Sequence, residues 1–67
     1  MRNPDRIGPF CDRLKAIWSV VPDWRFGQLM ENVRRIMLKD GGRDIFFAED
    51  EALMQYMEDL FFKGEQP

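Results

Sequence analysis

The chain has 67 residues, a formal net charge of −2, a single cysteine and no histidine. At this length we expect one domain, 1–67, and neither an internal disulfide nor a zinc site of cysteine and histidine can form. Small chains without such a staple depend on good helix packing or on association. Because 45% of the residues are hydrophobic and 13% are aromatic, we expect a homo-oligomer, most simply a homodimer.

The first expected element is an amphipathic helix that ends near residue 20. Asn3-Pro4-Asp5 is a favourable helix start, with a capping side chain, an early proline and an acid near the N-terminus. Pro9 would clash with an earlier carbonyl inside a helix, so the helix begins either at residue 4 or at residue 9. The apolar positions follow the helical period; they are Ile7, Phe10, Cys11, Leu14, Ile17, Trp18 and Val21.

The second expected helix spans about 24–39, with Asp23 as its N-cap directly after Pro22. Its end is marked by Gly41-Gly42, because glycine accepts the left-handed backbone that commonly follows a helix. Its apolar stripe consists of Phe26, Leu29, Met30, Val33, Ile36 and Met37.

An apolar segment at 44–48 separates this helix from the last one. The segment is expected to be extended or a short β-strand, and a strand would need a second copy of the chain as its partner. In the alternative, the phenylalanines of an extended loop plug the helical core. The third helix is expected over 49–62, because acids suit a helix N-terminus and apolar residues recur at helical spacing. Together these elements predict an all-α fold of three short helices.

Charge is distributed unevenly along the chain. Residues 1–43 carry nine basic and five acidic side chains, and residues 44–67 carry one basic and seven acidic ones. We therefore expect the last segment to dock on the first, within one chain or between two. A basic cluster offers nucleic-acid binding as the alternative function, although the acidic last helix would repel phosphates. The cluster is Arg34, Arg35, Lys39 and Arg43.

No residue pattern indicates a catalytic or metal site, so we expect a protein that is not an enzyme and that needs no cofactor. The twelve residues from Asp40 to Glu51 have the length of a calcium-binding EF-hand loop. Position three is Gly42 and position six is Ile45, so an oxygen ligand and the glycine turn are both missing, and calcium is not expected. Cys11 lies on the first apolar stripe and is expected to be a buried, unreactive thiol.

The sequence gives no sign of export or of membrane insertion. No apolar run approaches the roughly 20 residues that span a bilayer, and the N-terminus lacks an apolar signal region. With a lone cysteine, these features indicate a cytoplasmic protein without a membrane partner.

Aromatic residues are more numerous than three short helices can readily bury. An association surface is therefore expected from the large apolar groups of the last segment and the start of the second helix. Its candidate residues are Trp24, Phe46, Phe47, Phe61 and Phe62. Phe61 and Phe62 are about 100° apart on a helix, so one of them should be exposed. Scattered surface hydrophobicity is the alternative interpretation.

Two elements of the sequence have a recognisable pattern. The first is Trp-x3-Pro-Asp-x-Arg-x-Gly-Gln-Leu, which runs from Trp18 to Leu29 with Trp24 and Phe26 at two of its variable positions. The second is Asp-x-Phe-[Phe/Tyr]-x-Glu-Asp-x2-Leu, at 44–53. With these elements the chain resembles a family of short uncharacterised bacterial proteins. The resemblance implies a small helical domain and brings no activity, ligand or catalytic residue.

The polar residues of these elements suggest either a shared recognition site or a structural ion pair. Arg25 could pair with Glu49 or Asp50 and so tie the second helix to the third. Taken together, the sequence favours a non-enzymatic module for protein–protein interaction or self-association.

Overall fold

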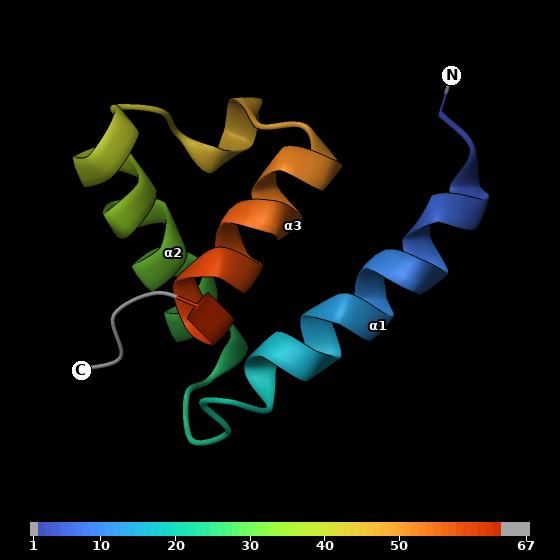
Figure 1. Cartoon of the computed structure of the whole chain (residues 1–67), viewed down its shortest axis with the longest axis horizontal. Coiled ribbons are helices and arrows are strands. Elements are labelled where there is room, and N and C mark those ends of the chain that lie inside the picture. The colour runs from blue at the N-terminus through green and yellow to red at the C-terminus, as the bar shows by residue number, and fades with distance from the viewer. Residues whose placement is uncertain (1, 64–67) are drawn as a thin grey trace.

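The computed structural model describes residues 2–63, and these fold into helices without any strand (Figure 1). The all-α prediction is confirmed. In chain order the elements are the 3₁₀ turn η1 (Pro4–Arg6), α1 (Ile7–Trp18), α2 (Phe26–Gly41), the 3₁₀ turn η2 (Ile45–Phe47), α3 (Asp50–Glu58) and the π-helical turn η3 (Asp59–Lys63).

The first helix is continuous from Pro4, because η1 runs directly into α1. The Asn3 side chain caps it by accepting a hydrogen bond from the backbone N–H of Asp5 at 2.9 Å. Pro9 is the third residue of α1, where a backbone N–H has no partner within an α-helix, so the proline costs no α-helical hydrogen bond. The helix ends at Trp18, somewhat before the expected boundary near residue 20.

The connection from α1 to α2 is closed by a side chain of α1. The indole Nε1 of Trp18 donates to the backbone carbonyl of Trp24 at 2.8 Å. The prediction that Asp23 is the N-cap is wrong, because the turn continues past Asp23 and Arg25 occupies the capping position. The backbone N–H of Arg25 donates to Oε1 of Gln28 at 2.8 Å. At the other end Gly42 has a left-handed φ of 68° and donates to the Leu38 carbonyl, as the diglycine predicts.

The segment 44–48 is not a β-strand. Asp44 and Ala48 have extended backbones, but the residues between them form η2. The carboxylate of Asp44 accepts from the N–H of Phe46 at 3.0 Å, and its carbonyl accepts from the N–H of Phe47 at 3.1 Å. These local bonds provide partners for the backbone groups that a strand would leave unpaired.

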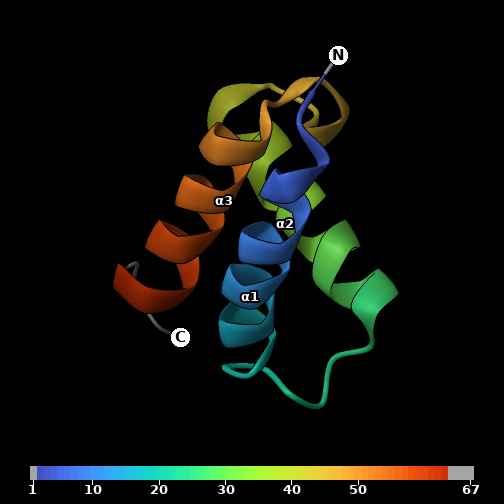
Figure 2. The same cartoon turned by 90° about the vertical axis from the view of Figure 1, so that its right-hand side faces the viewer.

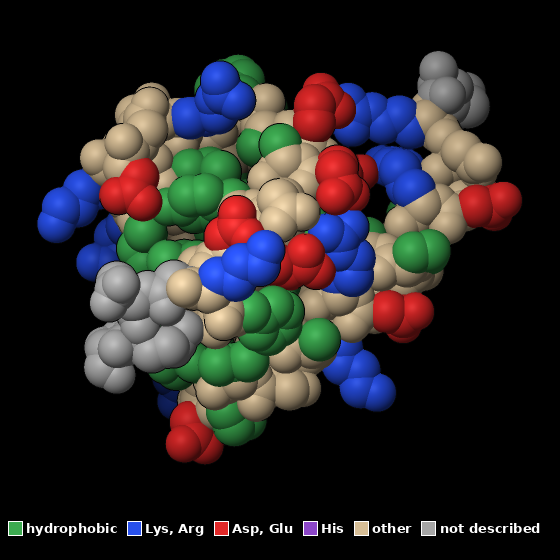
Figure 3. All heavy atoms as spheres, in the orientation of Figure 1, with side chains coloured by type: hydrophobic (Ala, Val, Ile, Leu, Met, Phe, Trp, Pro, Cys, Tyr) green, Lys and Arg blue, Asp and Glu red, His purple; other side chains and the backbone are tan. Residues whose placement is uncertain are grey.

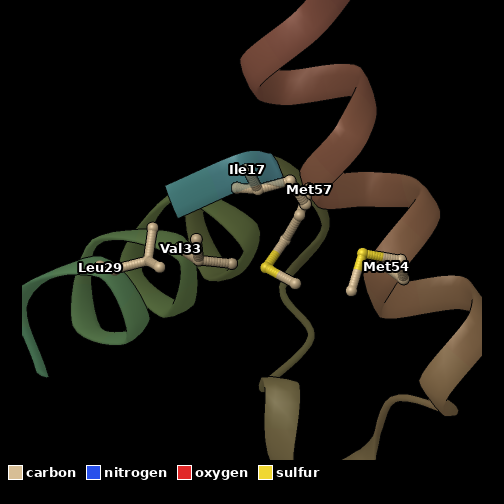
Figure 4. Packing of buried hydrophobic residues seen from close by; sticks show 5 residues of the cluster. All are labelled: Ile17, Leu29, Val33, Met54 and Met57. Carbon is tan, nitrogen blue, oxygen red and sulfur yellow. The ribbon is translucent and has the colours of Figure 1, made fainter. Parts of the chain in front are cut away.

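The helices enclose a small core that is displaced toward one end of α1. Figure 4 shows α2 and α3 presenting leucine, valine and methionine side chains toward one another, with one isoleucine from α1. The fully buried residues are Ile17, Leu29, Val33, Met54 and Met57. Figures 1 and 2 show α1 beside α3. Helix α2 packs against another side of α3. Since only Ile17 of α1 is buried, most of the α1 stripe lies at the edge of the core.

Candidate interaction surface

Two phenylalanines project into solvent from the turn between α2 and α3, which we call the aromatic turn (Ile45–Phe47). Phe46 is 82% exposed and Phe47 is 75% exposed. Their ring centroids are 4.9 Å apart and the rings are nearly perpendicular, at 84°, which is a favourable edge-to-face arrangement. The expected loop whose phenylalanines plug the core is therefore not found.

The aromatic turn is fixed by residues other than the two phenylalanines. Ile45 packs against the core, and Asp44 holds the turn through its two hydrogen bonds to backbone N–H groups. Arg34 Nε lies 3.7 Å from Oδ2 of Asp44 and links the turn to α2. The rings of Phe46 and Phe47 are thus presented on a well-held backbone, although the core does not use them.

The other three candidate aromatics lie at the opposite end of α3. Trp24 and Phe61 are partly buried and make an edge contact, with ring centroids 5.9 Å apart. Phe62 is 48% exposed, whereas Phe61 packs against the core, so the two neighbours diverge as expected. The five candidate residues therefore form two separate groups rather than one surface.

A row of ion pairs joins the N-terminal segment and α1 to α3. Arg2 pairs with Glu49 at 2.8 Å, and Arg6 pairs with Asp50 at 2.7 Å. Figure 3 shows the basic and acidic side chains meeting along this line. These pairs confirm that the acidic segment docks on the basic one. They also place Glu49 and Asp50 against the segment that leads into α1, so neither acid is the partner of Arg25.

Arg13 is the residue of this row that pairs with two acids of α3. Its guanidinium contacts Glu51 at 2.9 Å and holds both carboxylate oxygens of Glu58 at 2.8 Å. Hydrogen bonds to Glu58 and then Glu51 raise the pKa of Arg13 further above its usual value. The hydrogen bond from Arg13 lowers the pKa of Glu58. The row therefore consists of ionised groups that stabilise one another, which is a structural role.

The acids of the twelve-residue segment from Asp40 to Glu51 do not converge. Asp40 accepts a hydrogen bond from the hydroxyl of Tyr56 at 2.8 Å, Asp44 caps the aromatic turn, and Glu51 binds Arg13. Burial, with the hydrogen bond to Asp40 second, raises the pKa of Tyr56 to about 12. Within residues 2–63, no three carboxylate or thiol side chains are grouped as metal ligands.

The basic cluster of the alternative function is partly neutralised. Arg34 contacts Glu31 at 3.2 Å, and Arg35 donates to Oδ1 of Asn32 at 2.7 Å. Arg35 and Lys39 line one depression beside Trp24, whereas Arg43 lines a different one beside Tyr56. The four side chains therefore do not form one continuous basic face.

The thiol of Cys11 is exposed, contrary to the expectation that it is buried. The reason is geometric, because the α1 stripe is wider than the core that it meets and Cys11 lies on its outer edge. Around it is an open depression lined by Cys11, Leu14, Lys15, Trp18, Ser19 and Pro22. This apolar face is the feature that the sequence pattern alone does not distinguish from core.

The two sequence elements are explained mainly by folding contacts. In the first, Trp18 and Gln28 secure the two ends of the turn that leads into α2. In the second, Asp44 caps the aromatic turn, and Glu49 is one of the acids that dock on α1. Within residues 2–63, the ring of Phe46 makes an aromatic contact only with that of its neighbour Phe47.

No helix within residues 2–63 is long and apolar enough to cross a membrane. Comparison of the chain with protein-family models, with curated proteins and with solved structures gives no significant match.

Proposed function

We propose that this chain is a non-enzymatic protein–protein interaction module that binds a second polypeptide through the aromatic turn. The observation that carries the proposal is the pair Phe46 and Phe47, at 82% and 75% exposure, on a backbone fixed by Asp44 and Ile45. Large apolar side chains in water are unfavourable unless something covers them, and interfaces are enriched in such residues.

The energetics of the aromatic turn suit an interface anchor. Burying two phenylalanines removes roughly 300 Å² of surface from water, worth about 7 kcal/mol at about 25 cal/mol per Å² before the costs of association. Since the backbone of the turn is already ordered, little conformational entropy would be lost on binding. An aromatic pair of this kind has the size and rigidity of a typical binding hot spot.

The charged residues support a binding role rather than catalysis. Arg13, whose pKa is raised, and Glu58, whose pKa is lowered, are paired with each other across the α1–α3 contact. We therefore propose no reaction and no cofactor. The proposal extends to a cytoplasmic location, for which the lone cysteine is the support. It also extends to membership of the family of short bacterial proteins, for which the two sequence elements are the support.

Photo-crosslinking from the aromatic turn tests the proposal. Phe46 is replaced by p-benzoylphenylalanine in the full chain, which is expressed in its native host and irradiated. We expect a discrete adduct, with a second protein or with another copy of the chain, that weakens when Phe47→Ala is added. The matched control carries the same probe at Val20, an aliphatic position that is 43% exposed on a different part of the chain.

Two results would contradict the proposal. Absence of a discrete adduct from position 46 would show that the aromatic turn has no partner, and an equal adduct from position 20 would show that the contact is non-specific. A nuclease-sensitive adduct would instead favour nucleic-acid binding through Arg34, Arg35, Lys39 and Arg43.

A further inference from the structure

One face of α1 carries apolar residues that the core leaves uncovered. Ile7 is 52% exposed, Cys11 is exposed, and Leu14 and Trp18 are only partly buried. These four positions are spaced by four, three and four residues. This is the heptad spacing of the contact between two helices that pack side by side with nearly parallel or antiparallel axes. We call them the α1 seam.

The α1 seam continues onto the start of α2. Phe26 is 47% exposed and its ring lies 5.5 Å from the ring of Trp18. The depression around Cys11 and Leu14 is also bounded by Pro22, so it is mostly apolar and open to solvent. Two of the large exposed hydrophobic residues of the chain, Ile7 and Phe26, thus flank the same face.

The charges beside the α1 seam are complementary to those of the same face on a second copy. Asp12 and Lys15 lie on its outer flank, and within residues 2–63 neither makes an ion pair, whereas Arg6 and Arg13 on the opposite flank are bound to α3. A face that carries one acid and one base three residues apart can pair with a rotated copy of itself, acid to base.

We infer that the α1 seams of two copies pack against each other in antiparallel orientation about a two-fold axis. Cys11 then lies opposite Leu14 of the second copy, and Ile7 covers Trp18 and Phe26 of the second copy. The reciprocal contacts follow from the symmetry. Lys15 comes within reach of Asp12 of the second copy, so the flanking charges are neutralised in pairs.

The antiparallel orientation is favoured over the parallel one by size and charge. A parallel pair would oppose Trp18 to Trp18 and Lys15 to Lys15, which places two bulky rings in one layer and two like charges side by side. The antiparallel pair instead sets each large ring against an isoleucine and each base near an acid. The aromatic turn takes no part in this contact, so the inference stands or falls separately from the proposed function.

Solution mass is the first test. Light scattering of the full chain over a range of concentrations should show a dimer, and Ile7→Glu should give a monomer with unchanged far-ultraviolet circular dichroism. Val20→Glu is the matched control, because Val20 is a similarly exposed aliphatic residue at 43% outside the seam, and it should remain dimeric. Phe46→Ala/Phe47→Ala should also remain dimeric.

Charge reversal gives a second readout that does not depend on changing an apolar residue. Lys15→Glu should weaken dimerisation by about fivefold, because two exposed ion pairs per dimer become repulsive. The double variant Asp12→Lys/Lys15→Glu should restore it. A monomer at every concentration, or a dimer that survives Ile7→Glu or ignores the charge reversal, would overturn the inference.

Crosslinking tests the orientation. With a rise of about 1.5 Å per residue and an interaxial distance of about 8–10 Å, the two Cys11 sulfurs lie within about 10 Å of each other. A short bismaleimide should therefore join two wild-type chains. In the Cys11→Ser/Ile7→Cys variant the two thiols are about 16 Å apart along the helix axis, and crosslinking should be lost at a concentration where light scattering still shows a dimer. Equal crosslinking from position 7 would refute the antiparallel arrangement.

Discussion

The aromatic residues at the two ends of α3 are buried to different extents. At the end that we call the closed end, Trp18, Trp24, Phe26 and Phe61 contact one another in pairs and three of them pack against the core. At the other end, Phe46 and Phe47 contact each other and are largely exposed. The same residue type is structural in one place and available for binding in the other.

The difference arises from how many elements reach each end. Three segments meet at the closed end (Figure 1): the turn after α1, the start of α2, and η3. At the aromatic turn, Ile45 alone fills the position next to the core. An aromatic side chain is therefore buried only where several elements supply neighbours, and its presence in a sequence does not say which case applies.

Truncation at the closed end should have the largest effect. Trp24→Ala removes the ring that contacts Phe61, and the free energy of unfolding should fall by about 3 kcal/mol. Trp24→Phe is the control and should lose much less, because the hydrogen bond from Trp18 goes to the backbone carbonyl of residue 24. Urea unfolding measures both, and equal losses would contradict the packing role of the ring.

The ion-pair row should contribute less than the closed end and should depend on pH. Arg13 lowers the pKa of Glu58, so the unfolded chain binds a proton at this group more readily than the folded chain. The stabilisation is therefore complete above the ordinary glutamate pKa of about 4.5 and is lost as the pH falls through the lower folded value.

Arg13→Gln tests this row directly. The variant should be less stable than wild type at neutral pH, and the difference should shrink in acid. Thermal unfolding between neutral pH and about pH 3 measures the difference. A gap between the two proteins that stays constant over this range would show that Glu58 does not contribute through Arg13.

Tyr56 tests how α3 is held to the end of α2 near the aromatic turn. Its hydroxyl joins α3 to Asp40 near the end of α2, and its pKa is raised to about 12 from 10.0. A raised pKa contributes stability below the unfolded value that is lost as the pH rises through the folded one. Because the chain has one tyrosine, the tyrosinate absorbance should report this shift alone, and in urea the midpoint should return to about 10.

The smallest effect is expected at the aromatic turn itself. Phe46→Ala/Phe47→Ala removes two exposed rings, so the free energy of unfolding should change by no more than about 0.5 kcal/mol. Chemical unfolding of this double variant and of Trp24→Ala, measured side by side, compares the two losses of free energy of unfolding directly. A loss as large as that of Trp24→Ala would mean that the two rings belong to the fold after all.

The sequence periodicity predicted the core far better than the surface. Leu29, Val33 and Met57 are buried as their helical spacing indicates, and Gly42 ends α2 where a left-handed residue was expected. Spacing says which residues share a helix face, but not how far a neighbouring helix extends along that face. For this reason Cys11 was wrongly expected to be buried.

Partners across the fold were also beyond reach of the sequence. The charge division predicted that the acidic segment docks on the basic one, but not that Glu49 and Asp50 meet Arg2 and Arg6 rather than Arg25. That choice depends on the angle between α1 and α3, which no local pattern encodes. Likewise, the bonds of Asp44 that make 45–47 a 3₁₀ turn compete with a strand through local geometry alone.

The hydrogen bond between Trp18 and the carbonyl of Trp24 has a consequence for how unfolding is observed. Both tryptophans of the chain lie at the closed end, so tryptophan emission reports on that end only, while far-ultraviolet circular dichroism reports on every helix. If the end that carries the aromatic turn opens first, helicity will fall before the emission changes. The separation of the two curves would then measure the cooperativity between the two ends of the molecule.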